Sequence, residues 1–428
     1  MKKIILIIFF FITKVEASVI YDYEIESFIS NILQKINSDE EVNINFSLIL
    51  NDIPNAFVGE ENKIYLTSGL LKYIQSPEAL IGVLAHEVGH IKKFHITKRK
   101  KRIKNIQILD QVSSLAAVTT SLLSNNPEIL LQSVITSKSN IQNYYSAYSK
   151  NQEKEADLYA IQKLNELKIS SKGLIKFLEF LEYEFNKKGY SKDSFMFSTH
   201  PNYNDRINII NNLSNDKYTD IDNRTLDKFL FIKAKLFGHT EKNIQSLDKY
   251  LSGNYLDYAI SIILAKQGKL FESMIKINNL IEKKPDNIFL LETKADILFN
   301  HGYSLEAKKF YQKALYKNNK NLHIMTRLFN ISYDSIENEN YENVNNIYHK
   351  YNDIIFNYYQ NINFYYKWLH IFKILKKDDW ILFIESWINI LKDNKKEAII
   401  KLKEIKKTSN NNKLIYNANK LINQIDNA

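Results

Sequence analysis

The C-terminal half of this 428-residue chain repeats a pattern of side chains every 34 residues. Glycine recurs at positions 268 and 302, and small or apolar residues recur at fixed distances after it. The matched pairs are Phe271 and Leu305, Ser273 and Ala307, Ile277 and Tyr311, Leu280 and Ala314, and Ile281 and Leu315. A period of this length corresponds to a supersecondary unit that must stack on its neighbours to bury its apolar face. We therefore predict a solenoid of helices from residue 223 to residue 428.

This period, with small residues where two helices would touch, resembles the tetratricopeptide repeat. Two units are clear, and Leu226–Leu251 and Phe364–Ile405 look like degenerate units of the kind expected at the ends of a solenoid. A generic helical bundle is the alternative interpretation. We expect Trp368, Trp380 and Trp387 to pack inside the terminal helices, with peptide binding as the alternative role.

The N-terminal half contains the string His86-Glu87-Val88-Gly89-His90. Two histidines four residues apart share one face of an α-helix and can bind one zinc ion, and the glutamate between them can act as a base on water bound there. Ser76-Pro77-Glu78 supplies an N-cap residue, a first-turn proline and an acidic first turn. The string therefore lies in the helical context that zinc binding requires.

A second segment can complete the metal site. Glu153 and Asp157 are four residues apart, and the chain has no cysteine, so metal ligands must come from His, Asp and Glu. One carboxylate can bind the metal while the other accepts the free N–H of a ligand imidazole. A surface acidic cluster is the alternative. His95 is nine residues after His86, so on a continuous helix it would face away from the metal, and we predict that it is not a ligand.

Three further segments predict β-structure. Residues 42–50 alternate apolar and polar side chains, which indicates a half-buried strand. Residues 55–58 and 63–66 flank Gly59-Glu60-Glu61-Asn62 and predict a β-hairpin. We expect a small antiparallel sheet whose edge could pair with an extended substrate, and a helical pair over residues 109–131 that covers the site.

Residues 1–17 have the pattern of a signal peptide. Lys2-Lys3 precedes the nine apolar residues Ile4–Ile12, and Val15-Glu16-Ala17 is a small-x-Ala cleavage pattern. Nine residues are too few for a bilayer span, which needs about 20. We expect an exported, soluble protein that is cut after Ala17, with a retained anchor as the alternative.

The formal net charge of +10 raises the question of nucleic acid. Most lysines alternate with Asn, Asp and Glu, which is typical of solvated helix faces, and export argues against a nucleic-acid partner. The densest basic run, residues 98–102, is either a solvated helix end or a peripheral contact with anionic lipid headgroups. The low content of 10 Gly and 5 Pro favours helix over tight turns.

Three motifs together resemble the HtpX and CaaX-prenyl-protease family of zinc metallopeptidases. They are the run from Asn55-Ala56-Phe57 to His90, the segment Glu153-x-x-Ala156-Asp157, and Ser198-Thr199-His200-Pro201 with Arg206 beyond it. This resemblance covers roughly residues 20–215. It implies a gluzincin-type α+β metalloprotease domain, which we place at residues 18–222, in a chain that is mainly α.

The resemblance also implies roles for individual residues. His86, His90 and Glu153 would bind one zinc ion per chain, Glu87 would be the general base and proton shuttle, and Asp157 would orient a ligand histidine.

Two more residues come from the third motif. His200 would lie near the zinc ion, either stabilising the oxyanion or occupying the open coordination position and keeping the enzyme latent. Arg206 would support the substrate or the loop that carries His200. Lys150 stands where the family often has Arg, so positive charge is kept and bidentate pairing is lost.

The order of an exported protease followed by repeats is most similar to periplasmic members of this family. It implies a periplasmic zinc endopeptidase with a chaperone-like role, which degrades misfolded or stalled outer-membrane proteins and aids their assembly. The repeats would contact the outer-membrane assembly machinery. The alternative is a repeat-based chaperone or adaptor with low or latent proteolysis.

Overall fold

The structure is a computed structural model of the 428-residue chain. It describes residues 19–38, 42–97, 148–188, 200, 203–214, 218, 221–317, 321–336, 340–356 and 361–426. The predicted signal peptide, the basic run at 98–102 and the predicted helical pair at 109–131 lie outside these residues. Among the described residues, no helix is both long enough and apolar enough to cross a membrane.

The chain forms two compact units. Unit 1 comprises residues 27–233 together with the residues before 22, and unit 2 comprises Asp22–Glu26 with residues 234–428. Helices α1 (Tyr23–Ile36) and α12 (Asn223–Thr240) each contribute residues to both units.

Unit 1 contains one small sheet with the strand order β1-β2-β4-β3. The strands are β1 (Val19–Ile20), β2 (Asn45–Ile49), β3 (Ala56–Val58) and β4 (Lys63–Thr67). The predicted hairpin is confirmed, because β3 and β4 pair antiparallel across the short 3-10 segment η1 (Glu60–Asn62). The prediction of an antiparallel sheet is wrong for one pair: β2 and β4 run parallel. Alternation of side chains locates strands but not their neighbours, and here β4 inserts between β2 and the edge strand β3.

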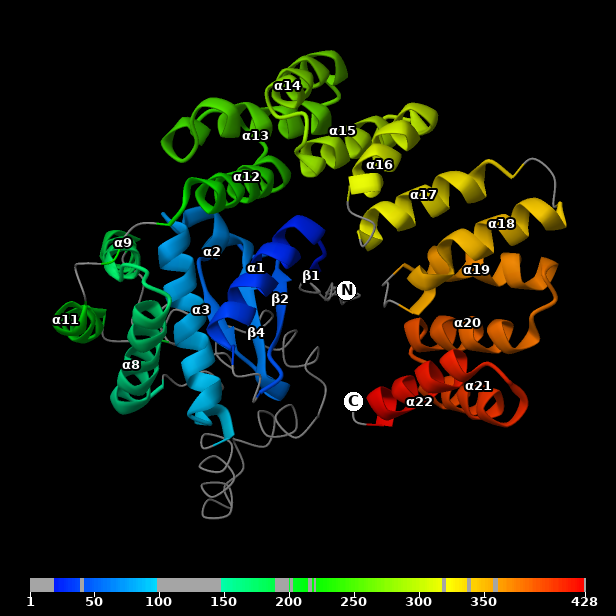
Figure 1. The fold of residues 1–428 in the computed structure, drawn as a ribbon, viewed down its shortest axis with the longest axis horizontal. Helices are drawn as coiled ribbons and strands as arrows, with labels where there is room; N and C mark the ends of the chain where they lie inside the picture. Colours follow the sequence, from blue (N-terminus) through cyan, green and yellow to red (C-terminus); the bar gives the residue numbers. More distant parts are fainter. Residues whose placement is uncertain are drawn as a thin grey trace, which may run out of the picture. The chain divides into compact units, whose positions relative to one another are not determined.

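Helix α3 (Pro77–Lys92) is the central helix of unit 1, and all but two of its residues are buried. Figure 1 shows it between the sheet and the helices α8 (Lys150–Glu166) and α9 (Lys172–Lys188), which pack against it. Its predicted start is confirmed, because the Ser76 side chain accepts a hydrogen bond from the Ala79 amide and Pro77 occupies the first turn.

Gly89 allows close approach of α3 and α8. A Cβ at this position would lie 3.1 Å from the Ala156 backbone, which is tighter than ordinary contact. The short distance between the two helices brings the ligand candidates on α3 within reach of those on α8. Two shorter helices, α2 (Ser68–Tyr73) and α11 (Tyr203–Leu213), complete the described part of unit 1.

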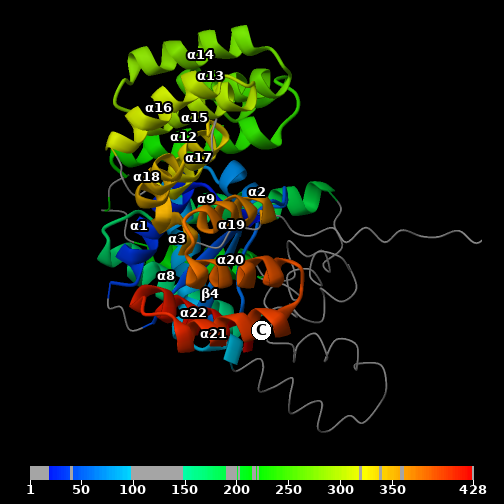
Figure 2. The ribbon, with the colours of Figure 1, turned by 90° about the vertical axis from the view of Figure 1, so that its right-hand side faces the viewer.

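Unit 2 is a series of helices that pack on their neighbours in chain order (Figure 1, Figure 2). After α12 they are η2 (Leu247–Lys249), α13 (Gly253–Lys266), α14 (Leu270–Lys283), α15 (Ile288–Asn300), α16 (Ser304–Lys317), α17 (Leu322–Asp334), α18 (Tyr341–Tyr351), η3 (Asn352–Phe356), α19 (Ile362–Ile374), α20 (Asp378–Leu391), α21 (Lys395–Thr408) and α22 (Asn412–Asp426). The predicted mainly helical fold with a repeat solenoid is confirmed.

The 34-residue period has a direct structural counterpart. Gly268 and Gly302 have positive φ angles of 77° and 87° and end equivalent helices, a conformation that favours glycine. Ser273 and Ala307 are both fully buried where the paired helices meet. Small residues at these positions let the two helices of each unit approach closely.

The three tryptophans lie in the core of unit 2, as predicted. Trp368, Trp380 and Trp387 are 0%, 4% and 7% exposed. Trp368 stacks on Phe329 with ring centroids 4.5 Å apart. Burial of these rings ties α17, α19 and α20 into one apolar core.

Candidate metal centre

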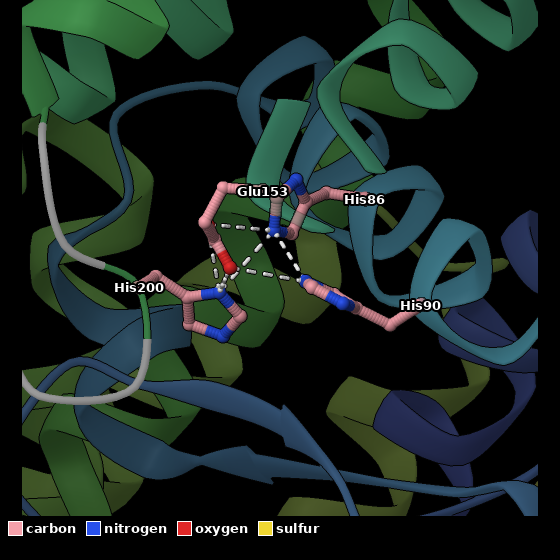
Figure 3. A group of neighbouring side chains, drawn as sticks. All are labelled: His86, His90, Glu153 and His200. Atoms are coloured by element: carbon pink, nitrogen blue, oxygen red, sulfur yellow. Dashed lines mark hydrogen bonds and ion pairs between the residues drawn. The ribbon is translucent and has the colours of Figure 1, made fainter. Parts of the chain in front are cut away.

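Four side chains from three parts of unit 1 point toward one another. Figure 3 shows His86 and His90 from α3, Glu153 from the first turn of α8, and His200, which precedes α11. Each offers a ligand atom, and these four atoms lie within 4.8 Å of one another. All four side chains are buried.

The spacing of these atoms fits a tetrahedral metal ion. The Nε2 atoms of His86 and His90 are 3.0 Å apart, and His200 Nδ1 lies 3.2 Å from His86 Nε2. The Glu153 oxygens lie 3.1 to 3.5 Å from the three imidazoles. Bonds of about 2.0–2.1 Å to a tetrahedral zinc give ligand atoms about 3.3 Å apart. The donor set and its geometry therefore suit one divalent metal ion.

Asp157 fixes the orientation of His86. Its Oδ1 lies 2.8 Å from His86 Nδ1, and the Arg206 guanidinium donates to both oxygens of the same carboxylate at 2.8 and 2.9 Å. Burial alone would raise the pKa of Asp157, but Arg206 and His86 outweigh it and lower this pKa to about 2. An ionised Asp157 holds a proton of His86 on Nδ1, so Nε2 is the nitrogen that His86 can offer to a metal ion.

Glu153 is also held in its ionised form. Burial opposes ionisation, yet the charges of His200 and Arg206 lower the pKa of Glu153 well below its usual value. A buried carboxylate that stays negative beside bare imidazole nitrogens is what a cation site requires.

His90 is held by groups that the sequence did not predict. His95 Nδ1 lies 2.8 Å from His90 Nδ1, and the Tyr148 ring stacks on His90 with centroids 3.7 Å apart. Burial lowers the pKa of His90 well below 6.5, which keeps the ring neutral. His95 is not among the ligand candidates, but the prediction that it faces away from the site is wrong, because it contacts His90. The prediction assumed one continuous helix, but α3 ends at Lys92 and the chain turns before His95.

Glu87 lies beside the four ligand candidates without joining them. It is 1% exposed, and its Oε1 is 3.4 Å from His200 Nε2. Burial raises the pKa of Glu87, and the neighbouring imidazoles of His200 and His86 oppose that rise. A buried carboxylate with a raised pKa beside the ligand candidates suits proton transfer.

A cavity of about 460 Å³, part of it open to solvent, adjoins Glu87. Its walls are mostly apolar and come from β3, α2, α3, α9 and α11. The lining residues are Pro54, Asn55, Ala56, Leu70, Val83, His86, Glu87, Leu174, Phe177, Leu178, Leu181, His200, Tyr203 and Arg206. A partly apolar space next to the candidate base can receive a substrate side chain.

The structure brings together all seven residues singled out from the sequence. His86, Glu87, His90, Glu153, Asp157, His200 and Arg206 form one buried cluster. The sequence analysis missed the buried Tyr148 and His95, which contact His90, and the exposed Glu155, which contacts His95. A third histidine five residues after His90 was the available signal for His95, but its direction depends on the turn after α3.

A second group of possible ligands lies in unit 2, where Glu292, Asp296 and His323 converge. Arg327 Nε lies 3.3 Å from Asp296 and Asn321 donates to Glu292, so these carboxylates already have protein partners. We interpret this group as an ion-pair network.

The chain is similar to known peptidases. Residues 21–214 match the sequence model of Peptidase family M48. The chain is 24% identical over 325 residues to the "Beta-barrel assembly-enhancing protease" of Yersinia pestis, covering 72% of this chain and 66% of that protein. The protein of the same name in Escherichia coli K12 is 23% identical over 273 residues, covering 61% and 55%.

A shorter similarity points in the same direction. "Metalloprotease YcaL" of Escherichia coli K12 is 25% identical over 168 residues, covering 39% of this chain and 61% of that protein. The chain therefore spans between 55% and 66% of the length of these relatives. The resemblance to a metallopeptidase family that the motifs predicted is confirmed for residues 21–214.

Proposed function

We propose that this chain is an exported zinc endopeptidase, in which residues 18–222 form the protease domain and residues 223–428 form a repeat domain that binds partner proteins. The convergence of His86, His90, Glu153 and His200, with Glu87 beside them, carries this proposal. Two imidazoles and one carboxylate are a common ligand set of catalytic zinc. The match of residues 21–214 to Peptidase family M48 supports the same assignment.

The proposed reaction is hydrolysis of a peptide bond. Zinc bound by His86, His90 and Glu153 supplies polarisation of the scissile carbonyl and a lowered pKa of the attacking water. Glu87 accepts the proton of that water and delivers it to the leaving amine. Asp157 and Arg206 hold His86 in the tautomer that leaves Nε2 bare.

His200 has two possible roles in this scheme. Its Nδ1 lies among the ligand atoms, 3.2 Å from His86 Nε2, which supports a resting state in which His200 occupies the fourth coordination position. Its Nε2 lies 3.4 Å from Glu87, which would suit stabilisation of the oxyanion after His200 has moved aside. We propose the first role, a latent enzyme.

The edge strand β3 supplies the proposed substrate contact. Its outer side has no partner strand in the described sheet, so an extended peptide can pair with it. Asn55, the residue before β3, is 6% exposed, and its Nδ2 has no hydrogen-bond partner among the described residues. This donor lies in the wall of the cavity and could bind a substrate carbonyl.

We propose unfolded or stalled outer-membrane β-strand proteins as substrates and the periplasm as the location. Relatives named as β-barrel assembly-enhancing proteases support both, together with the signal-peptide pattern of residues 1–17. The solenoid would then contact the outer-membrane assembly machinery, since stacked helix pairs expose extended binding surfaces.

Metal content and cleavage of an unfolded protein, measured together, test the proposal. We expect about one zinc per chain in the wild type and in Glu87→Gln, and a loss of at least about 10³-fold in kcat/KM for Glu87→Gln, because the amide cannot accept a proton. Glu166→Gln is the control for replacing a glutamate by glutamine, because Glu166 is a partly exposed residue on α8. A fully active Glu87→Gln protein would exclude the proposed chemistry.

The His200→Ala variant decides between the two roles of that residue. Removing a ligand that blocks the site should raise the initial rate of cleavage. An inactive His200→Ala protein that still binds zinc would instead identify His200 as a catalytic residue.

The alternative is an adaptor in which proteolysis is secondary. The long helical unit of residues 234–428 favours it, because that unit is about as large as the protease unit. Full complementation of a deletion strain by Glu87→Gln would support the adaptor; loss of complementation would support proteolysis.

A further inference from the structure

The turn after α3 places a third histidine against the metal centre. Lys93 caps the helix, and Phe94 adopts a left-handed conformation with φ of 55°. That conformation is strained for a non-glycine residue, and Phe94 is 63% exposed, so packing of the ring does not explain it. Its consequence is that His95 folds back and is completely buried.

A chain of short contacts runs from the metal centre to the surface of α8. His90 Nδ1 lies 2.8 Å from His95 Nδ1, and His95 Nε2 lies 2.9 Å from Glu155 Oε2. His90 and His95 are 0% exposed, whereas the Glu155 side chain is 47% exposed. The carboxylate therefore stands at the solvent end of a buried pair of imidazoles.

Only one arrangement of protons satisfies all of these contacts when a metal is bound. His90 Nε2 faces the other ligand atoms and must be bare, so the proton of His90 is on Nδ1. That N–H donates to His95 Nδ1, which must then be bare. The proton of His95 is consequently on Nε2, from which it donates to Glu155. Each nitrogen thus has one defined role.

The two ligand imidazoles are oriented by different means. His86 contacts the buried carboxylate of Asp157 directly, at 2.8 Å. His90 contacts a carboxylate only through His95, while the Tyr148 ring, inclined by 21° to the His90 ring, fixes the plane of the imidazole. Partners of this kind tune metal affinity by about 10–100-fold in other sites.

We propose that His95 and Glu155 are positioning residues that hold His90 in its metal-binding tautomer and orientation. The proposal rests on the proposed metal site and extends it by two residues outside the predicted set. Neither residue touches the ion or the substrate; both act through His90.

Zinc affinity of the full chain, measured by competition with a chelator, tests this proposal. His95→Phe keeps an aromatic ring and removes both hydrogen bonds, so we expect the dissociation constant to rise about 10–100-fold. His95→Gln should recover most of that loss, because its side-chain oxygen can accept from His90 while its amide donates to Glu155. Recovery by the amide separates hydrogen bonding from the filling of space.

Glu155→Gln isolates the charge at the end of the chain. Its amide oxygen still accepts from His95, so we expect a smaller loss of affinity than for His95→Phe. Glu166→Gln is a matched control on the same helix, because the Glu166 side chain is also 47% exposed. The control should bind zinc as the wild type does.

Imidazole nitrogen shifts provide a second measurement. In the zinc-bound wild type, ¹⁵N NMR should show His90 protonated on Nδ1 and His95 protonated on Nε2. The opposite tautomer of His95 would overturn the proposal.

The outcomes separate this proposal from the proposed function. A wild-type chain that binds no zinc overturns both. A wild type that binds zinc and cleaves substrate, with His95→Phe and Glu155→Gln of unchanged affinity, overturns only the positioning role. If His95→Phe does not fold, the zinc affinities of His95→Gln, Glu155→Gln and Glu166→Gln test the positioning role. A loss of zinc affinity in Glu155→Gln alone supports the proposal. Equal zinc affinities of the three variants reject it.

Discussion

Each of the two units buries a cluster of charges, and the clusters differ in how they are neutralised. In unit 1, Glu153 and three imidazoles converge on one point, and Arg206 contacts Glu153 at 3.5 Å but pairs more closely with Asp157, at 2.8 Å. In unit 2, Lys235 reaches Asp22 Oδ2 at 2.7 Å and Glu24 Oε2 at 3.3 Å. The ligand atoms of the first cluster can bind an ion from solution, whereas the second cluster contains its own cation.

This difference separates a site that can bind a ligand from a structural network. Buried carboxylates need a nearby positive charge, and the source of that charge decides what the cluster can do. Lys235 is 4% exposed, and its ammonium group is part of the chain, so it cannot exchange with an ion from solution. Its cluster therefore stabilises the fold. Arg206 neutralises Asp157 but leaves the ligand atoms of His86 and His90 available.

Removal of the lysine should have the largest effect on stability. Lys235→Met leaves Asp22 and Glu24 buried without their cation, which typically costs about 3–5 kcal/mol. We expect a lower free energy of unfolding in urea and faster hydrogen exchange in α12 and α15, with no recovery on adding zinc. Lys235→Met combined with Glu24→Gln should regain part of the loss; an equal or larger loss would contradict the pairing.

The arginine of unit 1 offers the corresponding test. Arg206→Met should cost a similar 3–5 kcal/mol in the presence of a chelator, because Asp157 loses its partner. Zinc should restore part of this stability, since the ion supplies positive charge next to His86 and Glu153. Urea unfolding with and without zinc measures the difference. If Arg206→Met lost the same free energy of unfolding with and without zinc, the cluster of unit 1 would not differ from that of unit 2 in its response to an added ion.

A smaller effect is expected from pH. Burial, with the negative charges of Asp22 and Glu292, raises the pKa of Glu24 to about 8, against the opposing influence of Lys235. A folded pKa above the unfolded value of 4.5 means that the stabilisation is present below pH 4.5 and is lost as the pH rises to about 8. Glu24→Gln should remove this loss, so its stability relative to wild type should increase from pH 5 to pH 8. A difference that does not change with pH would reject the assignment.

Local patterns predicted a large part of the molecule. The 34-residue period gave the helix pairs of unit 2, because Gly268 and Gly302 must end helices and Ser273 and Ala307 must lie between them. The spacing of His86 and His90 required one helical face, and Ser76 marked where that helix begins. Such features depend on neighbours within one or two turns, so a single sequence contains them.

Pairings between distant segments were less accessible. The alternation of residues 42–50 located strand β2 but did not show that β4 would join it in parallel. Resemblance to a family, rather than spacing, suggested that His200 and Arg206 join α3. The spacing of His95 from His86 predicted the wrong side-chain direction for His95. The prediction assumed a continuous helix, and the left-handed Phe94 interrupts that helix.

The sequence by itself therefore determined that the C-terminal half is helical, where α3 begins, and which residue types could bind a metal. Tertiary structure decided which of those residues meet: Gly89 admits α8 against α3, and the turn at Phe94 returns His95 to His90. The physical reason is range. Backbone propensity and helical phase act over a few residues, whereas the metal centre depends on atoms up to 114 residues apart lying within about 3 Å, which packing of the whole unit alone can fix.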